Sequence, residues 1–327
     1  MNLLSRRGYA VLLSLSGLIG VPACSDTKHA GTAAGETKVA PDSMGTSPAD
    51  VVTVAIRTTR NVRESSALAK SANRPDVLYT INDSGNEPIL FVLDTTGADR
   101  GAWRVKHSTN VDWEALAIGA CATRSSASCV YVGDVGDNDA KHPTRTLYRV
   151  PEPDARDSAF TGTVSAEHVT FAYPDQRHDV EAIYIAPNGD AFLITKRPQR
   201  GTRGRLRPAL VFRVPASAWS SKKPVMAELV DSLSIVPGSA PLRTITDASL
   251  SSDARHLAVR TYTQLFVYTT DPSTGRVTTG IAPTICNLTV LGEPQGEGVT
   301  WLSATGRFAF SSEGRAPLHL ATCPIPH

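Results

Sequence analysis

The feature that most constrains this chain is a two-strand pattern that recurs five times. Residues 178–197 show it most clearly: an acidic residue opens a short apolar strand, a turn follows, and a second apolar strand ends in polar residues. The other copies begin near Ser65, Asp112, Thr246 and Gly296. Repeats of roughly 40–50 residues built from strands, with insertions in some copies, predict an all-β fold, a β-propeller of five blades.

Each copy continues into a third apolar strand, and four copies have room for a fourth. The last copy has none, whereas residues 51–59 form a β-branched strand that belongs to no copy. We expect this N-terminal strand to complete the last blade, because that pairing closes the ring and removes an open sheet edge. Six blades remain an alternative if one lies within the long loops at residues 196–207 or 216–244.

One position at the start of the first strand is shared by all five copies. Because the first strand of each propeller blade lines the central channel, residues at this position converge on the axis. Carboxylates gathered there repel one another unless protons or a cation offset their charge, and hard oxygen ligands favour calcium. The alternative is a ring without metal that bonds to backbone amides of the inner strands. The predicted metal ligands, found by aligning the small residue that follows each, are Ser66, Glu114, Glu181, Asp247 and Glu297.

The N-terminal region is predicted to direct export. Residues 1–23 carry Arg6, Arg7 and a short apolar run, which is typical of a signal peptide. The segment ending at Cys24 resembles a lipoprotein lipobox, which implies a lipid on Cys24 and a membrane anchor in a bacterial cell envelope; a plain secretory signal is the alternative. Residues 24–50 read as a flexible tether and residues 51–327 as the single propeller domain. Loss of Arg6 and Arg7 removes the formal net charge of +2, so nucleic-acid binding is not expected.

The five cysteines fit one lipid site and two disulfide bonds in an oxidising compartment. Cys121 and Cys129 flank one turn and are predicted to pair. Cys286 and Cys323 would then pin the C-terminal segment. A zinc site is not expected, because the cysteines lack C-x-x-C spacing and a nearby pair of histidines.

The loops that follow the second strands return to the face where the first strands begin, because the two strands are antiparallel. These loops are rich in charge, and together with a divalent ion they suit an anionic phosphate ester. Asp83 or Asp137 would orient or deprotonate water, and one or more arginines would hold phosphoryl oxygens. The arginine candidates are Arg197, Arg260 and Arg315.

The copies resemble the blades of the soluble calcium-activated nucleotidases, the apyrase family of five-bladed propellers. The resemblance rests on ESSALA with NDSG in the first copy and on WEALAIG with VYVGDVG in the second. It implies a central calcium held by one side chain per blade, in the order Ser, Glu, Glu, Ser, Glu. Asp247 departs from that order unless Ser249 is the ligand. Phytase-like and gluconolactonase-like calcium propellers are more loosely similar.

These observations predict an exported, calcium-dependent hydrolase of nucleotides or other phosphate esters. Two alternatives use the same face. One is a non-catalytic binding or scaffold propeller, and the other is a lactonase-like esterase with calcium as Lewis acid.

Overall fold

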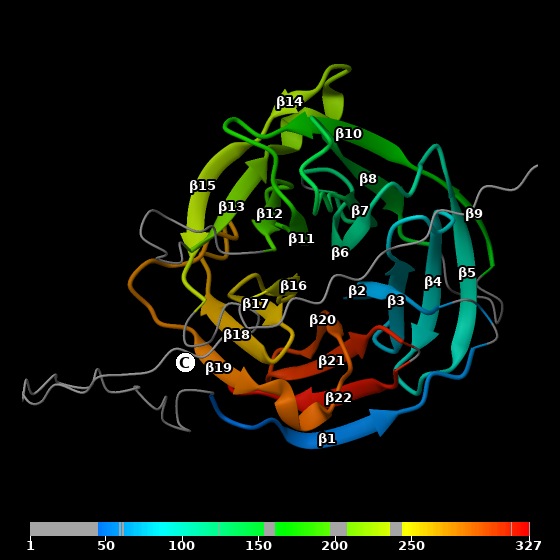
Figure 1. Cartoon of the computed structure of the whole chain (residues 1–327), viewed down its shortest axis with the longest axis vertical. Coiled ribbons are helices and arrows are strands. Elements are labelled where there is room, and N and C mark those ends of the chain that lie inside the picture. Colours follow the sequence, from blue (N-terminus) through cyan, green and yellow to red (C-terminus); the bar gives the residue numbers. More distant parts are fainter. Residues whose placement is uncertain are drawn as a thin grey trace, which may run out of the picture. The chain divides into compact units, whose positions relative to one another are not determined.

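The strands of this computed structural model form five sheets around a central axis (Figure 1). The structure describes residues 45–58, 60, 62–123, 125–153, 161–196, 208–235, 244–314 and 316–326. Within these residues the five innermost strands contact one another in a closed ring, in which the last strand touches the first. The prediction of a five-bladed β-propeller is confirmed, and the six-bladed alternative is wrong.

Each blade is built on an antiparallel sheet of four strands that runs outward from the axis. Blade 1 contains β2 (Ser65–Lys70), β3 (Val77–Asn82), β4 (Ile89–Asp94) and β5 (Asp99–Lys106). Blade 2 contains β6 (Trp113–Ala120), β7 (Ser128–Asp134), β8 (Arg145–Pro151) and β10 (Glu167–Ala172). Blade 3 contains β11 (Val180–Ile185), β12 (Ala191–Thr195), β13 (Ala209–Val214) and β15 (Glu228–Leu233). Blade 4 contains β16 (Ile245–Leu250), β17 (His256–Thr261), β18 (Gln264–Thr269) and β19 (Thr284–Asn287).

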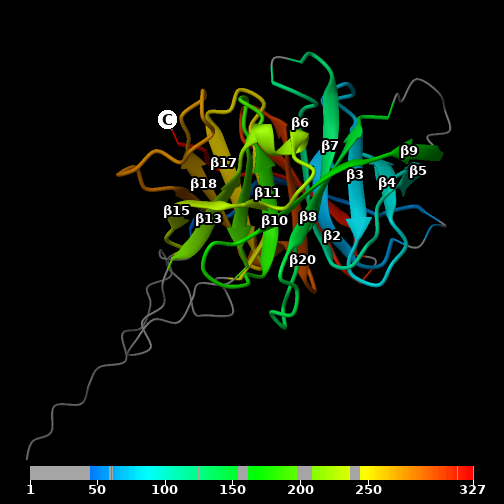
Figure 2. The same ribbon diagram turned by 90° about the horizontal axis from the view of Figure 1, so that it is seen from above.

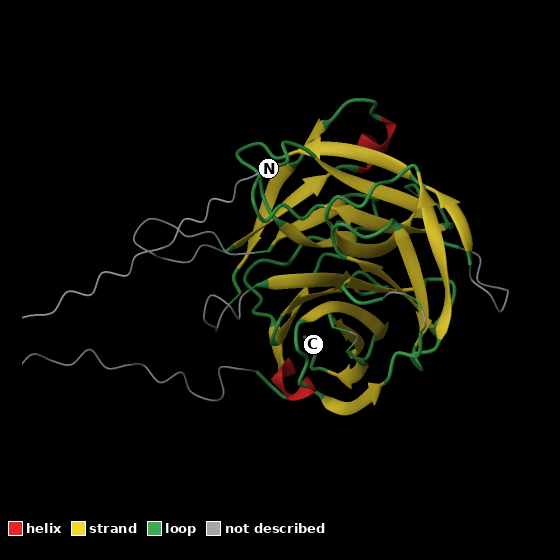
Figure 3. Ribbon diagram, turned by 45° about the vertical axis from the view of Figure 1, so that its right-hand side comes forward, coloured by secondary structure: helices red, strands yellow, loops and turns green. Residues whose placement is uncertain are grey.

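Blade 5 contains β20 (Gly296–Ser303), β21 (Arg307–Ser312), β22 (Leu318–Thr322) and, from the start of the chain, β1 (Ala49–Val54). Two blades carry a fifth strand that the sequence did not predict. Strand β9 (Gly162–Ser165) adds in parallel to β5, and β14 (Val225–Met226) adds in parallel to β10. Within the described connections lie two short 3-10 helices, Ala216–Ser220 and Leu288–Leu291 (Figure 3).

The inner strands of each blade are buried on both faces because neighbouring blades pack against them. Strands β3 and β11 are buried along their whole length and read as near-continuous apolar runs. In the outer strand β10, residues 169–172 alternate between buried and partly exposed, since only one face of the strand meets a neighbour. Figure 2 shows strands β7 and β8 of blade 2 side by side in the view turned by 90°.

The hydrophobic core is divided among the five interfaces between consecutive blades. Trp113 and Tyr148 of blade 2 pack against Tyr79 of blade 1, for example. The other four clusters join blades 2 and 3, blades 3 and 4, blades 4 and 5, and blades 5 and 1. Stability therefore depends on the closed arrangement, because each blade buries its apolar faces only between two neighbours.

Ring closure follows the predicted route, with a shift in strand bounds. Strand β1 pairs antiparallel with β22, with Val52 opposite Leu320 and Val54 opposite Leu318. It ends at Val54, earlier than predicted, because the chain then leaves blade 5 for blade 1, where the Arg57 amide donates to the Gly97 carbonyl at 2.7 Å.

Both predicted disulfide bonds are present. Cys121 pairs with Cys129, and Cys286 pairs with Cys323. Such cross-links are a feature of exported proteins. The predicted signal peptide, Cys24 and most of the tether lie outside the described residues and stay predictions. Within the described part of the chain, no helix is long and apolar enough to cross a membrane.

Candidate functional site

The predicted ring position coincides with a β-bulge that all five inner strands share. Near its start, each inner strand carries a residue that has no partner in the ladder with the second strand. The bulged residues are Ser66, Glu114, Glu181, Thr246 and, together with Gly298, Glu297. A bulge points its extra side chain away from the ladder, and here that position lies at one mouth of the channel.

This register corrects the alignment of blade 4. Thr246 occupies the position that had been assigned to Asp247. The hydroxyls of Ser66 and Thr246 behave alike: each donates to a carbonyl of the next inner strand at 2.9 Å, Ser66 to Trp113 and Thr246 to Glu297. Asp247 occupies the next position along, where the other blades have alanine or glycine.

Asp247 acts as an acceptor for backbone amides of the inner strands. Its carboxylate is fully buried and accepts from the amides of Val299 and Ala248 at 2.8 Å and of Leu68 at 3.3 Å. Burial raises the pKa of Asp247, while these donors act in the opposite direction. This residue thus ties blades 4, 5 and 1 together, and its predicted role as a metal ligand is not carried forward.

The three ring glutamates are buried and have different partners. Glu181 forms an ion pair with Lys196, with Oε1 to Nζ at 2.6 Å, and Glu297 accepts from the Gln295 amide at 2.8 Å. Glu114 is only 5 % exposed, and no described residue donates a hydrogen bond to its carboxylate. Burial raises the pKa of Glu114 well above its usual range, and Glu181 adds to the effect. A buried carboxylate without a donor is costly unless a proton or a cation accompanies it.

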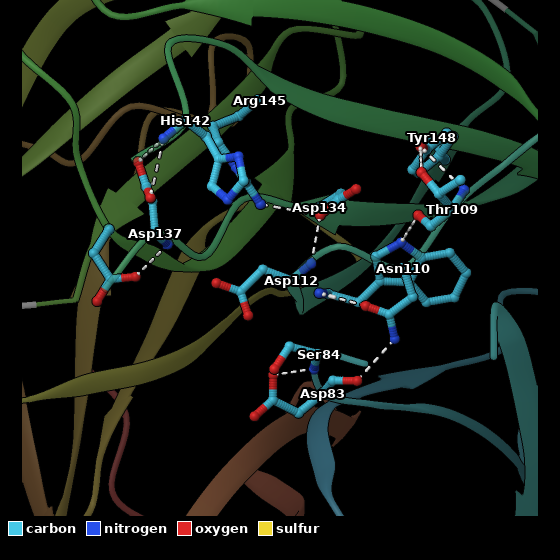
Figure 4. Close-up of polar contacts among 12 residues, drawn as sticks. Asp83, Ser84, Thr109, Asn110, Asp112, Asp134, Asp137, His142, Arg145 and Tyr148 are labelled. Carbon is cyan, nitrogen blue, oxygen red and sulfur yellow. Dashed lines mark hydrogen bonds and ion pairs between the residues drawn. The ribbon is translucent and has the colours of Figure 1, made fainter. Parts of the chain in front are cut away.

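Glu114 faces two further carboxylates. One oxygen each of Asp83, Asp112 and Glu114 lies within 4.8 Å of the other two, and within the described residues this is the one group of acidic, histidine or cysteine side chains so close together. Asp112 immediately precedes β6, Glu114 is the bulged second residue of that strand, and Asp83 follows β3 in blade 1. Figure 4 shows Asp83 and Asp112 on either side of this junction between blades.

Two neighbouring polar residues fix the cluster. The Asn110 side-chain amide donates to the carbonyls of Asn82 and Asp83 at 3.0 and 2.8 Å and accepts from the Trp113 amide at 3.0 Å, so it ties the two blades together (Figure 4). Behind Asp112, the buried Asp134 carboxylate accepts from the Asp112 amide at 2.8 Å and from Arg145 at 3.0 Å (Figure 4).

The mouth of the channel holds more acid than base. Burial, followed by the nearby Asp83 carboxylate, raises the pKa of Asp112 to about 6. The cations that act on the acids are Lys196, Arg145 and Arg260, and each is paired with a carboxylate of its own. The acids whose charges act on one another are Glu64, Asp83, Asp112, Glu114, Asp179, Glu181, Glu297 and Glu313. Such a field attracts cations.

The residues present fit a divalent ion with oxygen ligands. The donor set is three carboxylates, of which Glu114 has no protein donor. Gly136 leaves room beside them, because a Cβ at that position would lie 2.6 Å from Asp112 Oδ2 and 2.7 Å from Glu114 Cγ. Calcium accepts such hard oxygen ligands in loose geometry, whereas zinc prefers nitrogen and sulfur.

The other predicted site residues are placed differently. Asp137 is buried and caps its own loop, where its carboxylate accepts from the amides of Lys141 and His142. Arg260 is fully buried inside β17, donates to the carbonyls of Gly298 and Ser311, and pairs with Glu293. Neither side chain is available to a substrate. Arg197 and Arg315 lie outside the described residues.

Asp112 and Asn110 were not among the predicted site residues. Asp112 opens the second copy, but the prediction took only one ligand from each copy. The two carboxylates around the first residue of β6 were a usable signal, because both stand where the strand begins, at the mouth of the channel. Asn110 carried no such signal, because its role depends on a carbonyl of the preceding blade.

Comparison with known proteins shows no family for this chain. No protein-family model matches the chain, and no curated protein matches it. The chain is similar to a glutaminyl cyclase of Myxococcus xanthus, with 12 % identity, 85 % of this chain and 97 % of that chain covered, and a TM-score of 0.46. It is also similar to an aldose sugar dehydrogenase of Streptomyces coelicolor with bound PQQ, with 10 % identity, 84 % of this chain and 99 % of that chain covered, and a TM-score of 0.44. A third similar structure is the β-propeller domain of Cps50 (Swd1) from Myceliophteria thermophila, with 12 % identity, 84 % of this chain and 100 % of that chain covered, and a TM-score of 0.41.

Proposed function

We propose that this propeller binds calcium at the mouth of its channel through Asp83, Asp112 and Glu114, and that it hydrolyses a phosphate ester such as a nucleotide there. The observation that carries the proposal is the buried Glu114 carboxylate, which has no donor among the described residues and faces two further carboxylates. Three carboxylates supply the charge that a calcium site requires.

The ring supports the same proposal. With Thr246 in place of Asp247, the five bulged positions hold Ser, Glu, Glu, Thr and Glu. The calcium-activated nucleotidases, which the sequence resembles, have Ser, Glu, Glu, Ser and Glu, so blade 4 now differs from them by one methyl group. Ser66 and Thr246 also make the same bond to the next blade.

An anionic substrate needs a cation at this mouth, because the surrounding carboxylates would otherwise repel it. When bound, calcium would supply a Lewis acid for the phosphoryl oxygens. Asp83 is partly exposed and one of its carboxylate oxygens accepts from the Ser84 amide, which leaves the other for an ion or for orienting water. Lys196 holds Glu181 in place in the neighbouring blade 3.

The proposal includes export and anchoring. The two disulfide bonds suit an oxidising compartment. We assign the signal to residues 1–23 and the lipid to Cys24, with residues 24–50 as the tether. Labelling with a palmitate analogue should tag the wild type and leave Cys24→Ser unlabelled, whereas equal labelling would disprove the lipid.

Calcium binding is tested first, by titration calorimetry and thermal melts of EDTA-treated protein. Calcium should raise the melting temperature of the wild type, since a ligand at a hundred times its Kd adds about 2.7 kcal/mol. Glu114→Gln and Asp112→Asn should lose this response. Glu167→Gln, which alters an exposed glutamate of the outer strand β10, should keep it. If spermidine rather than calcium stabilises the wild type, the acidic mouth serves an organic cation and the calcium site is refuted.

Hydrolysis is tested separately, by phosphate release from nucleotides and phytate with and without calcium. Release that requires calcium and is lost in Asp83→Asn supports the hydrolase. Calcium binding without release from any of these esters would favour the non-catalytic binding propeller, and cleavage of a lactone instead would favour the esterase.

A further inference from the structure

A second concave site lies at the opposite end of the channel from the carboxylates. It has a volume of about 410 Å³ and is lined by the last residues of the five inner strands and by the turns that follow them. The carboxylates stand at the beginning of the same strands. The lining of blade 1 runs from Leu68 to Ala72, two to six residues beyond the bulged Ser66, which corresponds to about 7–20 Å along the strand at about 3.3 Å per residue.

The walls of this pocket come from every blade and are more apolar than polar. Ile118, Leu250 and Leu302 are partly exposed, whereas Leu68, Ile185 and Trp301 are buried against neighbouring blades, and many of the other lining residues are alanine or serine. The indole nitrogen of Trp301 already donates to the Ser249 carbonyl at 2.8 Å. Ile118, Leu250 and Leu302 therefore present the larger apolar surfaces to whatever enters.

Among the described residues, Lys70 is the one charged residue that lines the pocket. Its ammonium lies 3.4 Å from the Ser71 carbonyl, and no described carboxylate is within ion-pair distance of it. The hydroxyls of Ser71 and Ser128, which also line the pocket, are already used, because both donate to Glu152 behind the wall. Lys70 thus keeps ammonium donors for a ligand.

We propose that this pocket binds an amphiphilic monoanion, with an apolar chain of about ten carbons and a carboxylate that pairs with Lys70. At about 30 Å³ for each non-hydrogen atom, the pocket holds on the order of a dozen such atoms. The apolar walls remove the chain from water, and the carboxylate gives the ammonium a partner. The volume and lining are those of a small-molecule site, with few polar groups that fix orientation.

Calorimetric titration with decanoate and with decanol, below the concentration at which either forms micelles, tests the proposal. Wild-type protein should bind both, and decanoate more tightly. Lys70→Gln should weaken decanoate binding about ten-fold and leave decanol binding unchanged. Lys106→Gln, on the outer strand β5, is the matched control and should bind like the wild type.

Filling the pocket tests its location. Ser249→Phe should abolish binding of both ligands, and Ala304→Trp at the rim serves the same purpose if the first variant does not fold. Glu114→Gln, which changes the other mouth, should bind decanoate unchanged.

The proposal is overturned if folded wild-type protein binds neither ligand, or if Lys70→Gln binds decanoate as tightly as the wild type does. It is also overturned if Glu114→Gln alone reduces decanoate binding, since the ligand would then sit at the acidic mouth.

Discussion

The ammonium of Lys196 lies 2.6 Å from Oε1 of Glu181, and both side chains are almost completely buried. Burial alone would lower the pKa of Lys196, but Glu181 and Asp179 outweigh it and raise that pKa instead. The chain thus supplies an internal counterion for one ring glutamate and none for Glu114, which is why an external cation is assigned to the side of the mouth where Glu114 stands.

Removing one partner of this pair should be more costly than removing both. Lys196→Met should lower the free energy of unfolding by about 3–5 kcal/mol, because Glu181 is left buried without its counterion. The double variant Lys196→Met with Glu181→Gln should recover much of that loss, as measured by urea unfolding. Lys141→Met is the control, since Lys141 lies 2.7 Å from Asp139 but both side chains are 70 % exposed, and solvent screening should make its loss far less costly. A similar cost for both lysines would refute the role of burial.

The calcium-free protein should become less stable as pH rises. The folded protein holds the proton of Asp112 more tightly than the unfolded chain does, since its pKa is raised from 3.8 to about 6. This contribution is complete below pH 4 and is lost as pH rises through about 6, and Glu114 acts in the same direction at higher pH. In the presence of EDTA, the melting temperature should fall by a few degrees between pH 5 and 8, because each kcal/mol lost from the free energy of unfolding lowers it by about 2–4 °C. Asp112→Asn should show a weaker dependence, and an unchanged slope in that variant would contradict the assignment.

Asn110 should act as a positioning residue for the cluster. Asn110→Ala removes the bonds that hold Asp83 beside Asp112 and should weaken calcium binding by about 10–100-fold. Asn73→Ala provides the control: Asn73 also bridges blades 1 and 2, donating to Ser128 at 3.0 Å, but at the other end of the channel. Calorimetry should find wild-type affinity in that control. Equal losses in both variants would mean that general loosening of the blade junction, and not the position of Asp83, sets the affinity.

The two disulfide bonds should contribute unequally to stability. Cys121 and Cys129 are 8 residues apart, whereas Cys286 and Cys323 are 37 apart and close a longer loop in the unfolded chain. Replacing the second pair by serine should therefore cost about 1 kcal/mol more than replacing the first. Denaturant titration of the two double variants measures the difference. The reverse order would show that effects in the folded state outweigh loop entropy here.

Blade number, ring closure and both disulfide pairs were predictable because each depends on a pattern within one repeat or on counting strands. The position of Thr246 was not, because Ala248 imitates the small residue of the other copies while the bulge is defined only by pairing with β17. A shift of one residue in a strand changes which side chain reaches the channel.

The charged residues at the mouth of the channel were harder to predict, because the side chain of a charged residue near a strand end can point into the protein. Arg260 lies within β17, and glycine at position 296 leaves space for its guanidinium, which a Cβ there would meet at 1.9 Å. The Asp137 carboxylate accepts hydrogen bonds from the backbone amides of Lys141 and His142, so its side chain folds back on its own loop. Asp83 and Asp112 come together only through a contact between blades that no single repeat contains.

The pairing of β1 with β22 also sets an order of events during biosynthesis. The ribosome makes β1 first and β22 last, so the opening strand has to wait, unpaired, while every other blade is made. The final blade can assemble only after Leu318–Thr322 has emerged, which ties completion of the ring to translation of the fifth repeat. A chain that stalls within the fifth repeat keeps two open sheet edges and exposes the apolar faces of its first and fourth blades, which are features that chaperones and proteases detect.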